Sequence, residues 1–297
     1  TMSWIAVLPN LLLIALALVM LGVGLSLSLD DFKRLRHHPK AVSIALVLQM
    51  LVLPLLCWGL IKLFDLPPVL AVGLMLLAAS PGGISANLFS HLFGGHVALN
   101  ISLTAVNTIL SVITLPLITN LAIAHFLGNV GHVSLQTGKV IEVVAIVLLP
   151  VGLGMGIARW RPALAARLEK PFKILSALVL AAFTVIAVAK EWQALSASAA
   201  SIGGVVLAFN LLSLLSGYYL SRALGLAQPM ATAISYEIGI HNSTLAIYIA
   251  LSVLKDFQMA LPAAMYSVSM YIVGALFGLL VLRRSAGTGA VLQQGGR

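Results

Sequence analysis

Apolar segments long enough to span a membrane recur along the whole chain, with short polar connections between them. They lie at about 5–28, 41–63, 69–91, 97–124, 140–158, 173–189, 201–221, 229–253 and 261–282. A helix needs about 20 mostly apolar residues to cross the hydrocarbon of a bilayer. The pattern predicts an all-α polytopic membrane protein with about nine transmembrane helices in a single domain, 1–284. The small, polar stretch 285–297 is predicted to be a disordered cytoplasmic tail.

Two of the predicted spans are interrupted near their middle. The third contains Pro81, Gly82 and Gly83 within "AASPGGISANLF", and the eighth contains "YEIGIHNSTLAI", residues 236–247. Proline removes a backbone donor and glycine weakens a helix, so both segments are expected to break. Non-helical backbone at membrane depth is tolerated only where it is buried in protein or lines a wet cavity.

The two interrupted spans occupy equivalent places, each in the middle of a group of three. The groups run in opposite senses, and aligning Asn87 with Asn242 superimposes one interruption on the other. Interrupted segments at matching positions of two inverted halves indicate the binding site of a secondary transporter. The alternative is that each kink is an ordinary packing device of membrane helices.

Composition supports the membrane assignment. The chain is 61% hydrophobic and 8% charged, with a mean hydropathy of +1.09, whereas soluble domains average about 45–50% apolar and about 25% charged residues. Cys57 is the only cysteine, so neither an intrachain disulfide nor a thiol metal cluster is expected.

The net charge of +9 arises from basic residues gathered on one side of the predicted membrane. Those on that side are Lys33, Arg34, Arg36, Lys40, Arg159, Arg161, Arg167, Lys170, Lys173, Arg222, Arg283, Arg284 and Arg297; those on the other are Lys62, Lys139, Lys190 and Lys255. This bias predicts an N-terminus outside the cell and a cytoplasmic C-terminus. Because the charge is a topology signal, nucleic-acid binding is not expected.

Glu237 is the one acidic residue predicted to lie deep in the membrane. A charged side chain at the bilayer centre costs about 3 kcal/mol or more. No Lys or Arg is predicted at a comparable depth, so the carboxylate faces a bound cation or binds a proton. The alternative is a permanently neutral acid held by hydrogen bonds between helices.

Polar side chains in neighbouring spans supply oxygens for a cation. Gln49 lies within "ALVLQMLVLP", Asn87 follows the first interruption, and Asn100 and Thr104 share one helix face. Sodium, as a hard cation, favours such ligands. For each amide taken alone, an interhelical hydrogen bond is an equal explanation.

Other classes of function have weaker support. Intramembrane aspartyl proteolysis needs two apposed acids, and no aspartate is predicted within a span. A serine protease needs a base beside its nucleophile, and the two-residue spacing of His241 and Ser243 does not place them on one helix face. His91 and His96 lack a third metal ligand, so no metal beyond sodium is expected. A passive channel lacks repeated pore motifs, but the sequence does not exclude it.

Three stretches resemble the bile acid:sodium symporter family. They are "SPGGISANLFSHLFGGHVALNISLTAVNTILSVITLPLI", "YEIGIHNSTLA" and "LDDFKRLRHHPKAVSIALVLQMLVLPLL". The resemblance implies two inverted repeats with two broken, crossing helices, divided into a panel and a core. The panel comprises the spans at about 5–28, 140–158 and 173–189, and the core those at about 41–124 and 201–282. Family members usually have ten spans, so with nine predicted here the resemblance implies that the first is missing.

The resemblance also implies two sodium sites that share Glu237. The first contains Asn87, Thr104 and Glu237, with Ala86 and Asn100 in place of two family serines. The second contains Gln49, Glu237, the carbonyls of Ile238 and Ile240, and the side chain of His241. The family commonly has glutamine at the position of His241, so this histidine is either a partial proton-coupling device or a bystander.

The substrate of the family lies near the N-termini of the half-helices that follow each break. Here these are Ser85, Ala86 and Asn87 and, after the second break, Asn242 and Ser243. A His-Asn pair found in the last span of several relatives is replaced by Met270 and Tyr271. This difference favours a small hydroxy or keto acid over a bile acid.

The prediction is therefore secondary active, sodium-coupled symport of a small organic anion by alternating access. Its coupling ion is Na+, its surroundings are a lipid bilayer of the cell membrane (the inner membrane in a bacterium), and no protein partner is implied. A proton-coupled carrier or antiporter on the same scaffold is the alternative.

Overall fold

The computed structural model describes residues 4–128, 137–190 and 192–282, and these residues are helical, as predicted. The predicted tail, 285–297, lies outside the described residues. The α-helices are α1 (Trp4–Leu25), α2 (Leu29–Arg34), α3 (Pro39–Val47), α4 (Leu53–Leu63), α5 (Pro68–Ala79), α6 (Ile84–Leu92), α7 (Val97–Phe126), α8 (Thr137–Trp160), α9 (Pro162–Lys190), α10 (Trp192–Ala223), α11 (Gln228–Gly239), α12 (Ser243–Tyr248) and α13 (Leu261–Phe277).

Short 3-10 and π segments extend or connect these helices. They are η1 (Leu35–His37), η2 (Leu48–Val52), η3 (Ile249–Val253), η4 (Gln258–Ala260) and η5 (Gly278–Leu282). The π segment η2 joins α3 to α4 and contains Gln49, which the sequence placed in an unbroken helix. Such π turns recur at functional sites, because the extra residue per turn re-aims a side chain.

Within the described residues, five helices are long and apolar enough to cross a membrane. They are Pro39–Leu63, Val97–Phe126, Ile141–Trp160, Ile202–Ala223 and Gln258–Leu280. The two segments expected to break are divided into shorter helices, α5 and α6 at one break and α11 and α12 at the other. One predicted loop is wrong: much of the basic stretch after Trp160 is helical, because α9 begins at Pro162, where proline is favourable.

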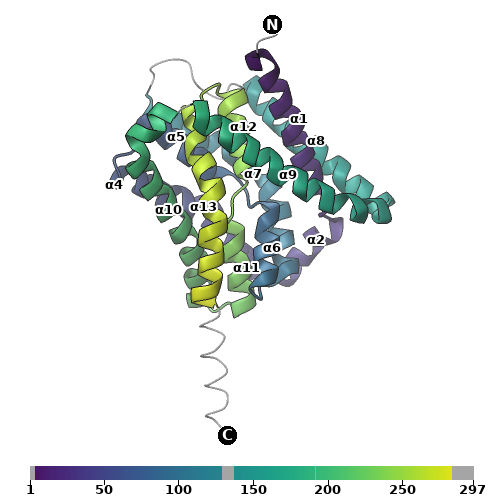
Figure 1. Cartoon of the computed structure of the whole chain (residues 1–297). Helices are drawn as coiled ribbons and strands as arrows, with labels where there is room; N and C mark the ends of the chain where they lie inside the picture. The colour runs from purple at the N-terminus through teal and green to yellow at the C-terminus, as the bar shows by residue number, and fades with distance from the viewer. Residues whose placement is uncertain (1–3, 129–136, 191, 283–297) are drawn as a thin grey trace.

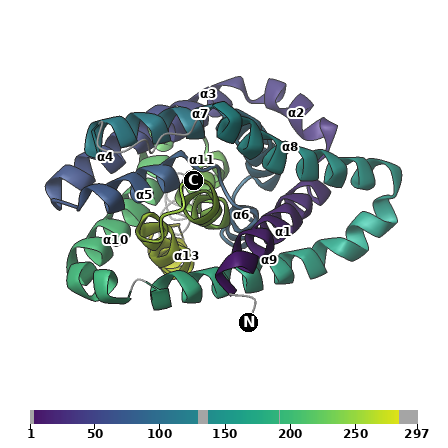
Figure 2. The same cartoon turned by 90° about the horizontal axis from the view of Figure 1, so that it is seen from above.

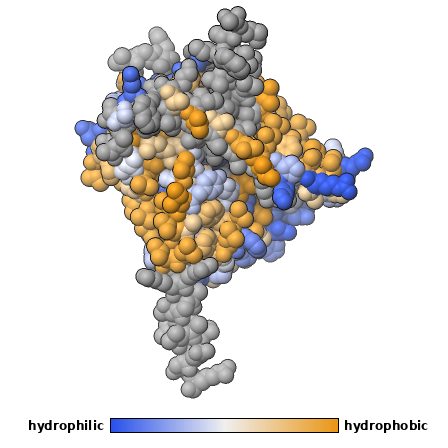
Figure 3. Space-filling view, in the orientation of Figure 1, coloured by the Kyte–Doolittle hydropathy of each residue, from blue (hydrophilic) through white to orange (hydrophobic). Residues whose placement is uncertain are grey.

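Two groups of helices pack around α1 and around α11, and the groups meet where α9 contacts α13 and α7 contacts α8. Helix α1 packs against α8 and α9, whereas α6, α7 and α10 pack around α11. From above, α8 and α9 form two sides of the molecule with α1 between them, and α11 lies inside (Figure 2). The surface is apolar over most of the face in Figure 3, with hydrophilic residues gathered at its margins, as expected for a protein surrounded by lipid.

The contact between α1 and α8 is a close approach of two backbones through glycine. A Cβ added at Gly154 would lie 2.5 Å from the carbonyl oxygen of Leu21, and one added at Gly24 would meet the backbone of Val151. Small residues let membrane helices approach closely enough for extensive van der Waals contact. A Cβ added at Gly152, two residues earlier on α8, would have no atom within 4 Å.

We expect Gly154→Ala to destabilise the protein by about 1–3 kcal/mol, because the added methyl group overpacks against backbone that cannot move aside. Gly152→Ala is the matched control, and it should leave stability unchanged or slightly raised. Thermal unfolding of the detergent-solubilised variants measures the difference. Equal midpoints for the two variants would show that the helices do not depend on this contact.

Candidate functional site

The two helix breaks are paired with each other by backbone hydrogen bonds. The Gly83 N–H donates to the carbonyl of Ile240 (2.8 Å), and the Asn242 N–H donates to the carbonyl of Pro81 (2.8 Å). Gly82 and His241 thus form one antiparallel β-bridge inside an otherwise helical protein. Each break supplies the partners that the other lost when its helix stopped, as buried backbone at membrane depth requires.

Side chains complete the backbone bonding at both breaks. The hydroxyl of Tyr266 and the amide of Asn210 donate to the carbonyl of Gly239 (2.8 and 3.0 Å). At the other break, the Gln49 amide donates to the carbonyl of Ser80 (3.1 Å), which also lies 3.0 Å from Nδ1 of His241. Because a carbonyl only accepts, Nδ1 of His241 carries the ring proton.

Glu237 is fully buried in the last turn of α11, directly beside the first break. Thr104 Oγ1 lies 2.6 Å from one carboxylate oxygen, and the Asn107 amide donates to the other (3.0 Å). A Cβ at Gly82 would lie 2.5 Å from the Glu237 Cδ and Oε1 atoms, so only glycine fits there. Two ion pairs that the structure describes, Lys33–Asp30 and Arg34–Asp31, do not include Glu237.

Several buried amide oxygens in the same region lack a hydrogen-bond donor. They belong to Gln49, Asn87, Asn100 and Asn107. The orientation of three of these amides is fixed, because their nitrogens donate to acceptors. Gln49 donates to the carbonyls of Ala78 and Ser80, Asn100 to that of Ala233 (2.7 Å), and Asn107 to the Glu237 carboxylate. Buried acceptors ordinarily have a partner, so these oxygens can accept a hydrogen bond from a ligand or water or can coordinate a cation.

The structure brings only some of the predicted sodium ligands into direct contact. Thr104 reaches Glu237, whereas the Asn100 amide bonds to backbone and the Ile240 carbonyl accepts the N–H of Gly83. Ile238 and His241 are buried beside the same break, and Nε2 of His241 has no partner among the described residues. Asn87 is half-buried.

Sequence reasoning missed Asn107 and the contact of Gly82 with Glu237. Asn107 follows Asn100 and Thr104 on α7 at the spacing of one helix face. The same periodicity that paired Asn100 with Thr104 therefore indicates Asn107 as well. The role of Gly82 has no such signal, because it depends on how closely α11 approaches the other break.

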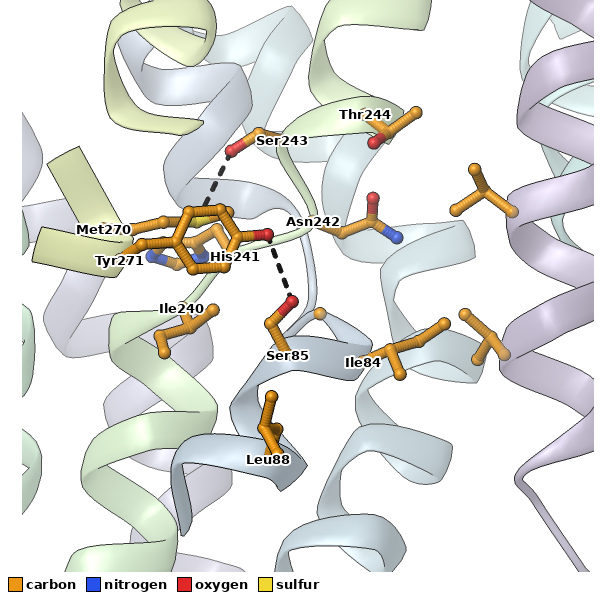
Figure 4. A pocket seen from close by; sticks show the side chains of 13 residues that line it. Ile84, Ser85, Leu88, Ile240, His241, Asn242, Ser243, Thr244, Met270 and Tyr271 are labelled. Atoms are coloured by element: carbon orange, nitrogen blue, oxygen red, sulfur yellow. Dashed lines mark hydrogen bonds between the residues drawn. The ribbon is translucent and has the colours of Figure 1, made fainter. Parts of the chain in front are cut away.

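A cavity of about 330 Å³ opens beside the paired breaks (Figure 4). Its lining residues come from α1, α6, α12, α13 and both breaks: Val19, Val23, Gly83, Ile84, Ser85, Leu88, Ile240, His241, Asn242, Ser243, Thr244, Met270 and Tyr271. None of these side chains is that of Lys, Arg, Asp or Glu. Small-molecule sites have this character, with mostly apolar walls and a few placed polar groups.

Three of the five predicted substrate residues line this cavity, namely Ser85, Asn242 and Ser243. Ala86 and Asn87 do not. Helix α6 begins at Ile84, and its residues Ser85 and Leu88 face the cavity. Ala86 and Asn87 lie on another side of the helix because of its period of 3.6 residues. Ala86 is fully buried against the protein instead.

The polar groups of the cavity are tied to one another in a defined way. Ser85 Oγ lies 3.1 Å from the hydroxyl of Tyr271, which joins the first turn of α6 to α13 (Figure 4). The Asn242 side-chain oxygen accepts the N–H of Leu245 (3.1 Å) and caps α12, so its amide nitrogen keeps two donors. The cavity therefore offers neutral donors at the ends of two half-helices.

Known proteins are similar to this chain over most of its length. The family model described as "Sodium Bile acid symporter family" matches residues 13–198. The chain is 32% identical over 293 residues to the probable sodium/metabolite cotransporter BASS1, chloroplastic, of Arabidopsis thaliana, covering 96% of this chain and 69% of that protein. It is 28% identical to the uncharacterized sodium-dependent transporter YocS of Bacillus subtilis (strain 168), covering 90% and 80%. It is also 30% identical to the P3 protein of Homo sapiens, covering 75% and 47%.

We expect Gly82→Ala to disrupt the site, because its methyl group would occupy the space of the Glu237 carboxylate. Destabilisation of about 1–3 kcal/mol is typical of such overpacking. Gly83→Ala is the control: the nearest atom, the carbonyl oxygen of His241, lies 3.4 Å from the added Cβ. Thermal unfolding in detergent tests both variants, and a Gly82→Ala protein as stable as Gly83→Ala would contradict the packing described.

Proposed function

The chain belongs to the sodium bile acid symporter family, a family of transporters rather than enzymes, and from this premise we propose that it is a secondary active transporter. It couples the entry of sodium to that of a small organic anion. The observation that supports this function best is a fully buried carboxylate, Glu237, in a region where buried amide oxygens lack donors. A carboxylate together with amide oxygens is the ligand chemistry of a hard cation.

Sodium is the cation that we propose for this region. The first site comprises Asn87, Asn100, Thr104 and Glu237, and Asn107 joins it through its free oxygen. The second comprises Gln49, Glu237, the carbonyls of Ile238 and Ile240, and His241. Gln49, Asn100 and Asn107 support the proposal because each turns its nitrogen to an acceptor and leaves its oxygen for a cation.

The organic anion binds in the cavity beside the breaks. Ser85, Asn242 and Ser243 lie there at the starts of α6 and α12, where backbone N–H groups and the positive end of the helix favour an anion. The volume of about 330 Å³ is near the lower limit for ligand pockets and suits a small hydroxy or keto acid. The absence of lining cations favours a single negative charge.

Transport proceeds by alternating access between two inverted repeats with broken, crossing helices. The panel contains α1, α8 and α9, and the core contains the remaining spans. The packing of α8 and α9 against α1 supports this division. The position of the cavity also supports it, because Val19 and Val23 of α1 line it together with residues of α6 and α12. The excess of Lys and Arg on one side supports a cytoplasmic C-terminus in the cell membrane.

Proton coupling on the same scaffold is the second candidate. The single hydroxyl proton of Thr104 has two acceptors within reach, the Glu237 carboxylate at 2.6 Å and the Asn100 carbonyl at 3.1 Å. If Glu237 is protonated, it can donate to Thr104, which then donates to Asn100. Uptake driven by a pH gradient without sodium would favour this candidate.

Glu237→Gln should abolish the sodium response while preserving the shape of the side chain. Removing one partner of a buried ion pair costs about 3–5 kcal/mol, so apparent sodium affinity should fall about 100-fold or more. The sodium-induced rise in thermal midpoint, relative to potassium, measures this affinity. Asp65→Asn removes an acid that is exposed at a loop and should keep the full response. A normal sodium response in Glu237→Gln would refute the assigned role.

Tyr271→Phe and Ser85→Ala should weaken anion binding and leave the sodium response intact. Each removes one neutral hydrogen-bonding group, which is worth about 0.5–1.5 kcal/mol, so KM should rise about three- to tenfold. A thermal-shift screen of small carboxylates in sodium first identifies the substrate for uptake assays. Tyr219→Phe, at a half-exposed tyrosine of α10 outside the cavity, should change nothing. Unchanged KM values in both cavity variants would place the anion elsewhere.

A further inference from the structure

The lining of the cavity beside the breaks differs in chemistry from one side to the other. Each polar side chain in it comes from a break, from the half-helix that follows the break, or from α13. Helix α1 contributes only two side chains, those of Val19 and Val23. Among the described residues that line the cavity, none belongs to α8 or α9. The proposed panel therefore presents an apolar surface to the bound anion.

The two valines lie inside the protein and not on its lipid-facing surface. Their exposed fractions are 5% for Val19 and 3% for Val23, whereas Ile14, on an earlier turn of the same helix, is 57% exposed. Because they are four residues apart, they share one face of α1. That face is turned toward the cavity that both residues line.

Ile84 extends this apolar surface from the opposite side. It lines the cavity at the start of α6, and its side chain reaches away from Ser85 toward the purple ribbon of α1 (Figure 4). A Cβ added at Gly22 of α1 would lie 3.9 Å from Cδ1 of Ile84 and 3.2 Å from Cβ of Phe172 on α9. Helix α1 is thus packed closely against both neighbours, which fixes the positions of its valines.

Hydrogen-bonding groups lie across the cavity from α1. Ser85 and Tyr271 are joined there at 3.1 Å, and Tyr271 is on the side away from α1 (Figure 4). The amide nitrogen of Asn242 keeps two donors, because its side-chain oxygen caps α12. A ligand whose carboxylate accepts from these core residues must direct the rest of its body toward the valines and Ile84.

The size of the cavity limits that body. A volume of about 330 Å³ corresponds to about ten water molecules at the density of the liquid. This is room for a carboxylate, one further polar group and a short alkyl chain. A second carboxylate would have to be buried against apolar side chains, at a large cost in desolvation.

We propose that Val19, Val23 and Ile84 form an apolar subsite that selects the transported anion by the length of its aliphatic end. The substrate is then a 2-hydroxy or 2-keto monocarboxylate that carries an alkyl chain. This inference rests on the proposed function and specifies its substrate. Each buried methylene group raises affinity about fourfold, until the chain meets the valines of α1.

The test measures the binding of unbranched 2-hydroxy acids, from lactate to 2-hydroxyoctanoate, to the purified protein in sodium. The rise in thermal midpoint with acid concentration gives an apparent affinity for each acid. Val23→Ala enlarges the subsite, Val23→Ile reduces it, and Val19→Ala enlarges it one turn away. Val147→Ala is the matched control, because Val147 is also buried (1% exposed), on α8, and does not line the cavity.

We expect the affinity of wild type to rise about fourfold with each added carbon and then to fall once the chain is too long. The optimum should move to a longer acid in Val19→Ala and Val23→Ala, to a shorter one in Val23→Ile, and should stay in Val147→Ala. Equal affinities of wild type for all the acids would overturn the subsite. An optimum that neither Val23 substitution moves would overturn its assignment to α1.

Repeating the series in potassium separates this inference from sodium coupling. Equal affinities in the two salts, with the same dependence on chain length, would refute coupling and leave the subsite intact. If no acid raises the midpoint in either salt, the cavity is not the anion site, and the subsite is overturned with it.

Discussion

The burial of one carboxylate, Glu237, is the constraint around which the protein is organised. Among the described residues, Glu237 is surrounded by hydrogen-bond donors and a glycine, and it forms no ion pair. A carboxylate in such surroundings is stable only with a cation or a proton. Nearby amide oxygens that lack hydrogen-bond donors are further available ligands for a cation. The proposed binding of sodium rests on this electrostatic deficit, which the described residues do not correct by themselves.

The breaks in two helices make this arrangement possible, and each break stabilises the other. Two backbone hydrogen bonds join them, while Tyr266, Asn210 and Gln49 satisfy carbonyls that the helices no longer use. The pairing also connects the cation region to the cavity, because His241 belongs to the β-bridge and lines the cavity at the same time. A cation that draws the two breaks together would thus order the half-helix ends that face the anion, which gives a physical basis for coupling.

The cavity beside the breaks has no charged lining and offers neutral donors at the starts of α6 and α12, which suits a transported ligand that must also leave. Close glycine packing holds α1 against α8, as the proposed movement of panel against core requires.

Local patterns in the chain were enough to predict the helical class, both breaks and the burial of Glu237, because membrane length, proline chemistry and the cost of a buried charge are local properties. Of the nine predicted spans, five correspond to described helices that are long and apolar enough to cross a membrane. Of the five substrate residues that the family resemblance implies, Ser85, Asn242 and Ser243 line the cavity. Tertiary structure alone decided that Thr104 and Asn107 meet Glu237 across more than a hundred residues, that Gly82 leaves room for its carboxylate, and that Ser85 pairs with Tyr271. These contacts depend on the register between packed helices, which no local pattern specifies.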